Sequence, residues 1–309
     1  MTSRASAPRP RPVPARHAVP PAVVSPDLPA SVAIPRLLDA HGPRLFALGL
    51  RLCGNRDDAQ DMVQDTFLQA FRRWGTFRGQ ADAGTWLYTI AARSCKARMR
   101  RKGGTDRRMP AVSQLMPWKE TTIMEVAAAA EGQEDPAEHR EALARVQREI
   151  ARLPEHLRIV IVLKEIAGLS VDDVASALAL AEGTVKTRLH RGRLALRKAM
   201  TARAASVSAP APIYEKQVCL DLLKTKLEAM DRGGEPAGRK VPQAEVCARC
   251  RAVFRELDLV QDACTQMASG QMPPQARSRI LKMIAERDAT QRSAVKRPAR
   301  GRRPVARSR

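Results

Sequence analysis

The chain has 309 residues and a formal net charge of +22, from 54 Lys and Arg against 32 Asp and Glu. This length accommodates two or three small domains, and the positive charge favours a polyanionic partner such as nucleic acid. No apolar run is long enough to cross a bilayer, and the N-terminus lacks a continuous apolar core. We therefore expect a cytoplasmic protein without a membrane partner. Six scattered cysteines argue against a secreted disulfide scaffold.

Residues 1–33 repeat Pro, Ala and Arg, which predicts a disordered tail. Residues 34–103 then show helical periodicity. The strongest stretch runs from Arg56 to Gly75, where apolar residues recur every three or four positions. Its first turns are acidic and its end is basic, an order that suits the helix dipole. Four acids nevertheless exceed what capping requires, and they predict a negative patch for a basic protein partner: Asp57, Asp58, Asp61 and Asp65.

A polar loop, residues 76–84, separates this stretch from a second predicted helix, residues 86–102, which Thr85 can cap. Aromatic residues flank the loop, and cations crowd the C-terminal half of the helix. This combination suits single-stranded DNA, because bases can unstack into an aromatic pocket while cations hold the backbone. The alternative is that Phe77, Trp86 and Tyr88 are simply core residues. For Trp86 the sequence favours neither interpretation over the other.

Leu169 to Met200 predicts two helices around a tight turn at residues 179–181. Ser170 and Asp173 form a capping-box pattern ahead of the first helix. The second helix starts near Glu182 and has an apolar inner face. Its outer face is polar and mostly basic: Thr184, Lys186, Thr187, Arg188, His190, Arg191, Arg193 and Arg197. The pattern predicts a helix-turn-helix whose second helix enters a major groove. A solvated basic helix on an ordinary helical domain is the alternative.

Both stretches resemble one family. "GLS" followed by "GTVKTRLHRGR" closely resembles the DNA-reading C-terminal domain of extracytoplasmic-function (ECF) sigma factors of the sigma-70 family. "DDAQDMVQDTFLQAFRRWGTFRGQADAGTWLYTIAAR" resembles the promoter-melting domain of the same family. Where that family often has Asn and then Asp in the following helix, this chain has Arg93 and Ala97. The departure suggests further phosphate contacts there.

The resemblance implies roles for particular residues. Asp61, Gln64 and Asp65 match the positions that bind the clamp of the largest RNA polymerase subunit. The residues implied at the −10 element are Phe77, Arg78, Gly79, Thr85 and Trp86, with Arg93, Lys96 and Arg100 as added cations. The outer-face residues of the helix-turn-helix, from Thr184 to Arg197, would read the −35 element.

The C-terminal part carries Cys219 and Cys247-x-x-Cys250. Paired thiolates at this spacing suit a tetrahedral zinc ion. The segment partly resembles the zinc-binding anti-sigma domain, although the position of the family's His is Gln243. Three interpretations stay open: a three-thiolate zinc site with an unnamed fourth ligand, a redox pair, or a metal-free fold with the cysteines in its core. No other cofactor is expected. As a hypothesis, this segment modulates the other domains in cis.

The sequence thus predicts an all-α protein: a tail (1–33), sigma region 2 (34–103), a linker (104–137), sigma region 4 (138–201), a linker (202–212), an anti-sigma-like helical domain (213–289) and a basic disordered tail (290–309). It predicts a non-enzymatic sigma factor whose partners are core RNA polymerase and promoter DNA, with a separate anti-sigma factor as a possible third. The alternatives are a stand-alone helix-turn-helix regulator or redox sensor, and a basic DNA-packaging protein. The acidic helix beside a strand-melting loop favours the sigma factor.

Overall fold

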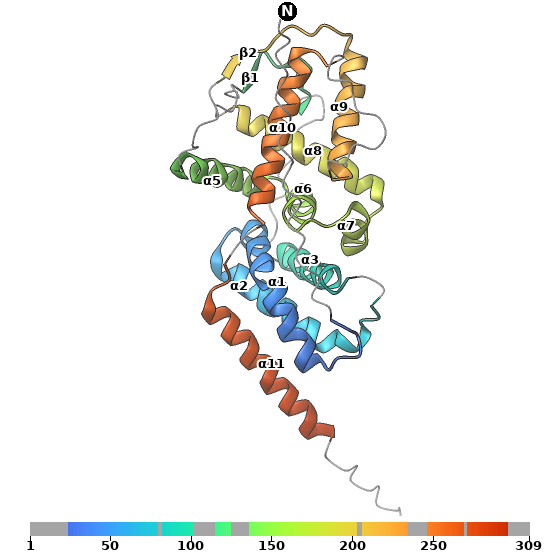
Figure 1. Cartoon of the computed structure of the whole chain (residues 1–309), viewed down its shortest axis with the longest axis vertical. Coiled ribbons are helices and arrows are strands. Elements are labelled where there is room, and N and C mark those ends of the chain that lie inside the picture. The colour runs from blue at the N-terminus through green and yellow to red at the C-terminus, as the bar shows by residue number, and fades with distance from the viewer. Residues whose placement is uncertain are drawn as a thin grey trace, which may run out of the picture.

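The computed structural model describes residues 24–79, 82–101, 115–124, 136–202, 206–233, 246–268 and 271–295. These residues are mostly helical, as predicted (Figure 1). The predicted N-terminal tail up to residue 23 and the basic tail from residue 296 lie outside the described residues. Among the described helices, none combines the length and the apolar character needed to cross a membrane.

The first helical group contains α1 (Ala30–Cys53), α2 (Arg56–Arg73) and α3 (Ala83–Arg101). Gly54 ends α1 in the left-handed region at a φ of 81°, where a residue without Cβ meets no steric penalty. The Asn55 side chain then accepts a hydrogen bond from the Asp58 N–H and caps α2. Phe67 and Leu87 are fully buried between the helices. A short 3₁₀ turn, Trp74–Thr76, leads into the loop before α3.

The second helical group contains α5 (Pro136–Arg152), α6 (Glu155–Ile161), the π-helical segment η3 (Val162–Ile166), α7 (Val171–Leu178) and α8 (Glu182–Thr201). The predicted capping box is confirmed, because the side chains and backbone amides of Ser170 and Asp173 bond reciprocally. The helix-turn-helix of α7 and α8 is therefore present. At Gly192 a Cβ would lie 2.7 Å from Ile161 Cγ1, so glycine lets α8 approach α6 closely.

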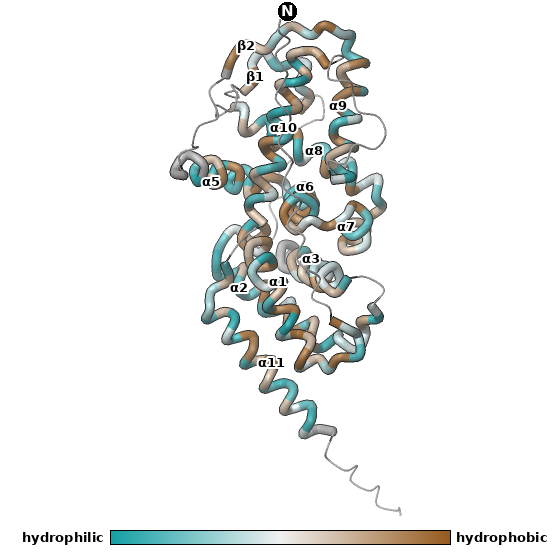
Figure 2. The backbone as a smooth tube through the Cα atoms, in the orientation of Figure 1, coloured by the Kyte–Doolittle hydropathy of each residue, from teal (hydrophilic) through white to brown (hydrophobic). Residues whose placement is uncertain are grey.

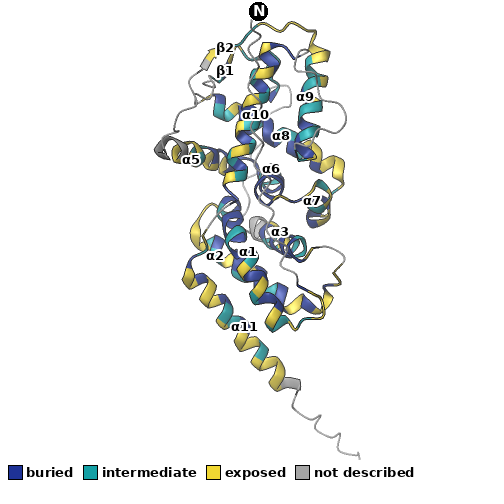
Figure 3. Ribbon diagram, viewed as in Figure 1, coloured by how far each residue is buried: buried dark blue, intermediate teal, exposed yellow. Residues whose placement is uncertain are grey.

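Three further helices follow: α9 (Lys216–Asp231), α10 (Ala248–Gln266) and α11 (Pro274–Val295). Helix α10 packs against α8, η3 and α5, and α11 lies along α1 and α2 (Figure 1). Hydrophilic and hydrophobic stretches alternate along α11 (Figure 2), and most of this helix is exposed (Figure 3). Its buried residues Ile280 and Ile284 nevertheless belong to the same apolar core as Phe67 and Val185. The C-terminal helices thus pack on both helical groups.

The two predicted linkers contain ordered structure that the sequence did not predict. A 3₁₀ turn (Pro117–Lys119) precedes β1 (Thr122–Met124), which pairs antiparallel with β2 (Ser206–Ser208). Ile123 lies opposite Val207 in this ladder. Each strand has three residues, too few to show an alternating pattern in the sequence, so the pairing depends on the tertiary structure. Two predicted boundaries also shift, since α1 begins within the predicted tail and α11 continues past residue 290.

Candidate functional site

The predicted polymerase-binding residues lie on one surface of α2. Asp61 and Asp65 are exposed, whereas Gln64 is half-buried. The Gln64 Nε2 donates to Met283 Sδ of α11 over 3.7 Å. Met283 also lines a groove of about 670 Å³ with Phe71 of α2. Helix α11 therefore lies directly beside the surface predicted for polymerase.

The contact between α11 and the first helical group combines apolar packing with one exposed ion pair. Ile280 and Ile284 supply the apolar part. Arg277 Nη2 lies 2.7 Å from Asp39 Oδ1 of α1, with both side chains about half exposed to solvent. An exposed pair of this kind contributes no more than about 1 kcal/mol. Apolar burial must then supply most of the stability of this contact.

The loop predicted to bind the −10 strand holds an aromatic cluster. The Phe77 ring is buried and stacks on Trp74, with ring centroids 5.1 Å apart. Trp86 packs against both rings and is half-buried. In this conformation Phe77 is thus a core residue, while Arg78 and Gly79 are exposed and Thr85 is half-buried. The Asp82 Oδ2, rather than Thr85, accepts hydrogen bonds at the start of α3, from the Gly84 and Thr85 N–H groups.

The basic residues predicted to contact the −10 strand lie on α3. Arg93 and Lys96 are exposed, and the Lys96 Nζ donates to the Leu178 carbonyl of α7 over 3.3 Å. The side chain of Arg100 lies outside the described residues. Helix α3 therefore contacts the first helix of the helix-turn-helix, so the two predicted DNA-binding units touch each other.

The two ends of the recognition helix α8 differ in accessibility. At its N-terminal end Thr184, Lys186 and Thr187 are exposed, as a base-reading surface requires. The Lys186 Nζ pairs with Glu182, one turn earlier, at 3.2 Å. Arg188 and Arg191 are half-buried in the middle of the helix.

At the C-terminal end the prediction of a solvent-facing surface is wrong for two residues. Arg193 is 1% exposed and Arg197 is 0% exposed. Arg193 pairs at 2.5 Å with Glu165 and also with Asp231 at the end of α9. These two carboxylates compensate the positive charge of Arg193, which would otherwise be too costly to bury.

Arg197 has the same arrangement. Its Nη1 lies 2.6 Å from Glu256 Oε2 of α10, and its Nη2 lies 2.5 Å from Glu120 Oε1 in the predicted linker. The other oxygen of Glu256 accepts a hydrogen bond of 2.6 Å from the Met124 N–H of β1. Glu256 is 1% exposed, so this carboxylate joins α8, α10 and the linker inside the protein.

His190 pairs with Asp231, the same carboxylate that pairs with Arg193. Its Nε2 lies 3.0 Å from Asp231 Oδ2. Burial opposes ionisation of Asp231, but the hydrogen bond from His190 and the charge of Arg193 outweigh it and lower the pKa of this carboxyl group. Asp231 therefore stays ionised at neutral pH, opposite two basic residues of α8.

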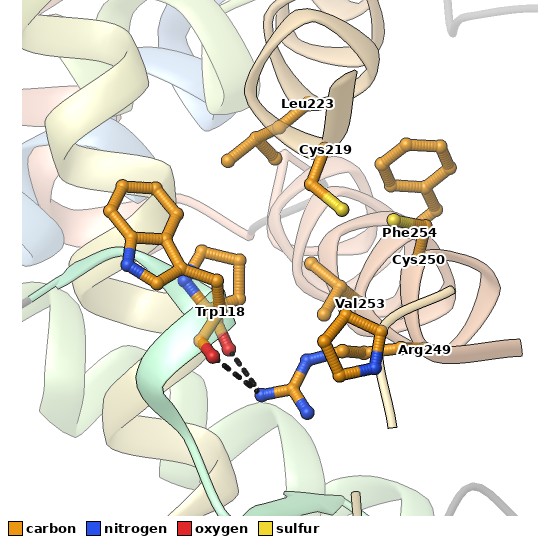
Figure 4. A pocket seen from close by; sticks show the side chains of 9 residues that line it. Trp118, Cys219, Leu223, Arg249, Cys250, Val253 and Phe254 are labelled. Atoms are coloured by element: carbon orange, nitrogen blue, oxygen red, sulfur yellow. Dashed lines mark hydrogen bonds between the residues drawn. The ribbon is translucent and has the colours of Figure 1, made fainter. Parts of the chain in front are cut away.

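The three predicted metal ligands lie together at the N-terminal end of α10. Cys247 and Cys250 are buried with Val246, and Cys219 of α9 packs against them. Figure 4 shows the Cys219 and Cys250 side chains beside each other between the two helices. Burial and the neighbouring Cys247 raise the pKa of Cys250 to about 12. Burial acts in the same direction on Cys247, but hydrogen bonds from Cys250 and backbone N–H groups lower its pKa.

These thiols do not complete a metal centre within the described ranges. There, no group of three or more Cys, His, Asp or Glu side chains has an arrangement that could hold a metal ion. A structural zinc site is usually four-coordinate, and the Gln243 position of the family's His lies outside the described residues. Zinc at Cys219, Cys247 and Cys250 stays a prediction.

Sequence reasoning missed the residues that hold the C-terminal helices in place. One is Arg249, which lies two residues after Cys247 and contacts both linkers. It donates to the carbonyl groups of Pro117, Trp118 and Pro210 at 3.0 Å, and Figure 4 shows its guanidinium reaching the linker. The other missed residues are the carboxylates Glu120, Glu165, Asp231 and Glu256. An acidic residue on an amphipathic helix carries no local signal of a distant partner.

Comparison with known proteins adds to this geometry. Residues 37–105 match the model of Sigma-70 region 2, and residues 143–196 match that of Sigma-70, region 4. The chain is 33% identical over 165 residues to the ECF RNA polymerase sigma factor SigW of Bacillus subtilis, covering 52% of this chain and 86% of that protein. It is 33% identical over 160 residues to the RNA polymerase sigma-H factor of Pseudomonas aeruginosa, covering 51% and 80%.

Among solved structures, CnrH in complex with the cytosolic domain of CnrY is 26% identical and covers 57% of this chain and 94% of that chain, with a TM-score of 0.39. That score is too low for the arrangement of the domains to be compared. The relatives and the two matched regions, together with the helix-turn-helix of α7 and α8, show that this chain belongs to the ECF sigma factors of the sigma-70 family and functions as an RNA polymerase sigma factor.

Proposed function

We propose that this sigma factor is held in a closed, inactive form by its own C-terminal segment, residues 213–295. The observation that carries the proposal is the burial of Arg193 and Arg197 under carboxylates of α9 and α10. In the open form, we propose, region 2 binds core polymerase and the −10 element, and region 4 binds the −35 element. The protein would then initiate transcription in the cytoplasm without catalysing a reaction.

The proposed open form assigns each predicted residue its role. Core polymerase is bound by Asp61, Gln64 and Asp65. The −10 strand is bound by Phe77, Arg78, Gly79, Thr85, Trp86, Arg93, Lys96 and Arg100. The −35 duplex is bound by Thr184, Lys186, Thr187, Arg188, His190, Arg191, Arg193 and Arg197. Phe77 would have to leave its stack on Trp74 to contact a base, which gives the melting step an opposing cost within the protein.

Charge explains how the C-terminal segment blocks region 4. DNA phosphates are the usual partners of arginines near the C-terminal end of a recognition helix. Here Asp231 and Glu256 occupy the guanidinium groups of Arg193 and Arg197. A phosphate can bind only after these carboxylates leave, and the side chains are too buried for both to bind together. The base-reading end of α8 at Lys186 stays exposed. The C-terminal segment therefore lowers the affinity of region 4 for DNA by removing phosphate contacts, and it leaves the base-reading residues accessible.

Region 2 is blocked by a different part of the segment. Helix α11 touches Gln64 through Met283 and buries Ile280 and Ile284 against α1 and α2. A polymerase clamp that engages Gln64 would meet α11 on the same surface. Because most of α11 is exposed, we propose that it leaves more readily than α10.

The linker between the two regions is held as well. Arg249 donates to the Pro117 and Trp118 carbonyl groups of this linker and to the Pro210 carbonyl group of the next one. Glu256 accepts from the Met124 N–H. The β1–β2 pairing closes the same segment against residues 206–208. The C-terminal segment therefore contacts region 2, region 4 and the linker, and we propose that all three contacts must open before both regions are free. A separate anti-sigma partner and zinc bound by the three cysteines stay predictions.

The substitution Glu256→Gln tests this proposal in the full chain. It keeps the shape of the side chain but removes the charge opposite Arg197 and beside the Met124 N–H. Hydrogen bonds to charged groups contribute roughly 1.5–3 kcal/mol, so the closed form should weaken and transcription should rise by about tenfold. The measurement is transcription in vitro with core polymerase on a pool of promoters.

The matched control is Glu215→Gln, an exposed carboxylate just before α9 whose side chain makes no capping bond. It removes the same charge from the same segment and should leave transcription unchanged. Equal transcription by the Glu256→Gln variant and the wild-type chain would contradict the closed form, provided that these two proteins unfold at the same temperature.

A further inference from the structure

A cavity of about 310 Å³ lies between region 2 and region 4, where α1 packs against α5. Its volume lies at the lower end of the range for small-molecule sites. The C-terminal end of α1 lines it with Leu50, Arg51 and Gly54. One face of α5 lines it with residues three or four positions apart: Ala144, Gln147, Arg148 and Ala151. The cavity is thus formed by two helices from different sigma regions.

Arg51 carries a buried charge that no carboxylate compensates. The residue is 9% exposed, and its Nη1 donates to the Ala47 carbonyl, one turn earlier in α1, over 2.7 Å. Among the described residues, no other hydrogen bond and no ion pair engages this guanidinium. A buried charge without a counter-ion is costly, and burial accordingly lowers the pKa of Arg51. An anion is therefore expected as its partner.

The groups that surround Arg51 do not supply this anion. Cys264 of α10 is near enough to act on Arg51 electrostatically, but burial raises the pKa of its thiol, which is therefore neutral at neutral pH. The C-terminal carbonyl groups of α1 carry only partial negative charge. Two of them are already satisfied, because Leu50 accepts from the Gly54 N–H and Leu52 accepts from Arg158.

Three polar side chains of the cavity have donors available to a ligand. In Arg51 the Nε is enclosed by protein and out of reach, whereas the Nη2 is neither enclosed nor bonded to a described residue. Gln147 and Arg148 are exposed, and no described residue forms a hydrogen bond or ion pair with either side chain. Among the described residues, no carboxylate lines the cavity. Its wall is therefore purely positive.

This set of donors matches a phosphate group. Guanidinium groups bind phosphate oxygens through charge-assisted hydrogen bonds, and two of them balance the two charges of a phosphate dianion. The Gln147 amide can donate to a further oxygen. Because Arg51 is almost fully buried, the cavity suits a small phosphate compound better than the backbone of a DNA duplex.

We propose that this cavity binds a small phosphate dianion, either inorganic phosphate or a phosphate monoester, between the Arg51 Nη2, the Arg148 guanidinium and the Gln147 amide. The inference rests on the closed form proposed above, because the wall is complete only when α1 of region 2 and α5 of region 4 are together. A ligand that binds only this form shifts the equilibrium toward it, by roughly 100-fold when its concentration is 100 times its Kd. The phosphate compound therefore strengthens inhibition.

The test is calorimetric titration of the full chain with inorganic phosphate, glucose 6-phosphate and adenosine monophosphate in turn, and with glucose as the neutral probe. At least one phosphate probe should bind, and the tightest one tells free phosphate from an ester. Arg148→Gln removes an exposed guanidinium and should weaken that binding by about tenfold or more. Arg255→Gln removes the same charge from an exposed position on α10 outside the cavity, so this matched control should bind like the wild-type chain.

The site is overturned if none of the three phosphate probes binds, if glucose binds as tightly as they do, or if the Arg148→Gln and Arg255→Gln variants bind equally well. The probe that binds should also lower transcription by the full chain. Binding that depends on Arg148 but leaves transcription unchanged would support the site and contradict inhibition in the closed form. The two proposals can thus fail separately.

Discussion

A chain that ends at Pro212 should transcribe roughly tenfold to 100-fold more than the full chain, in the range of ordinary coupling free energies between sites. The truncation removes α9, α10 and α11 but keeps β2, so the β1–β2 ladder is retained. It frees Arg193 and Arg197 from Asp231 and Glu256 and exposes the surface of α2 around Gln64. The measurement is transcription in vitro by core polymerase, with both chains at equal concentration.

A chain that ends at Pro273 separates the two blocked surfaces. It lacks α11 but keeps α9 and α10, so region 2 should be free while the carboxylates still hold region 4. Its transcription should lie between those of the other two chains. If the Pro212 chain is no more active than the full chain, although it binds promoter DNA, the C-terminal segment does not inhibit and the closed form is not a regulatory state.

Reversing two charges on α2 should reduce transcription by at least about 100-fold, because like charges across an interface cost several kcal/mol. The change is Asp61→Arg together with Asp65→Arg, made in the chain that ends at Pro212 so that α11 does not obscure the result. Both carboxylates are exposed, so the substitutions should leave folding intact. Binding to core polymerase and transcription are measured together.

The control for this loss is Glu141→Arg, which reverses an exposed charge on α5. It should change transcription little, and the double variant should still bind duplex DNA through region 4. Loss of DNA binding in the double variant would indicate a folding defect. Normal transcription by the double variant would contradict the assignment of this surface and revive a regulator that works without polymerase.

Local signals in the sequence were sufficient for the elements that resemble the family. The Ser170 and Asp173 capping box sets the start of α7, and polar-apolar periodicity defines α2 and α8. These features depend on residues within one or two turns of each other. The all-α class and the helix-turn-helix therefore followed from the sequence.

The sequence could not show which face of α8 is buried at its C-terminal end. The carboxylates that compensate Arg193 and Arg197 lie between 28 and 77 residues away along the chain. No periodicity marks Glu120 or Glu256 as partners of an arginine, and a basic helix end looks the same whether it faces water or a carboxylate. The exposure of a charged residue is set by packing that local patterns do not encode.

The affinity of core polymerase for the full chain and for the chain that ends at Pro212 tests the central claim most directly, because it needs neither a promoter nor a signal. Both chains carry the same Asp61, Gln64 and Asp65. If α11 and α10 hold the protein closed, the shorter chain binds with a Kd at least about tenfold lower, as expected when the binding-competent form is a minor population of the full chain. Equal Kd values would show that the C-terminal segment leaves the polymerase surface free, and would contradict the account.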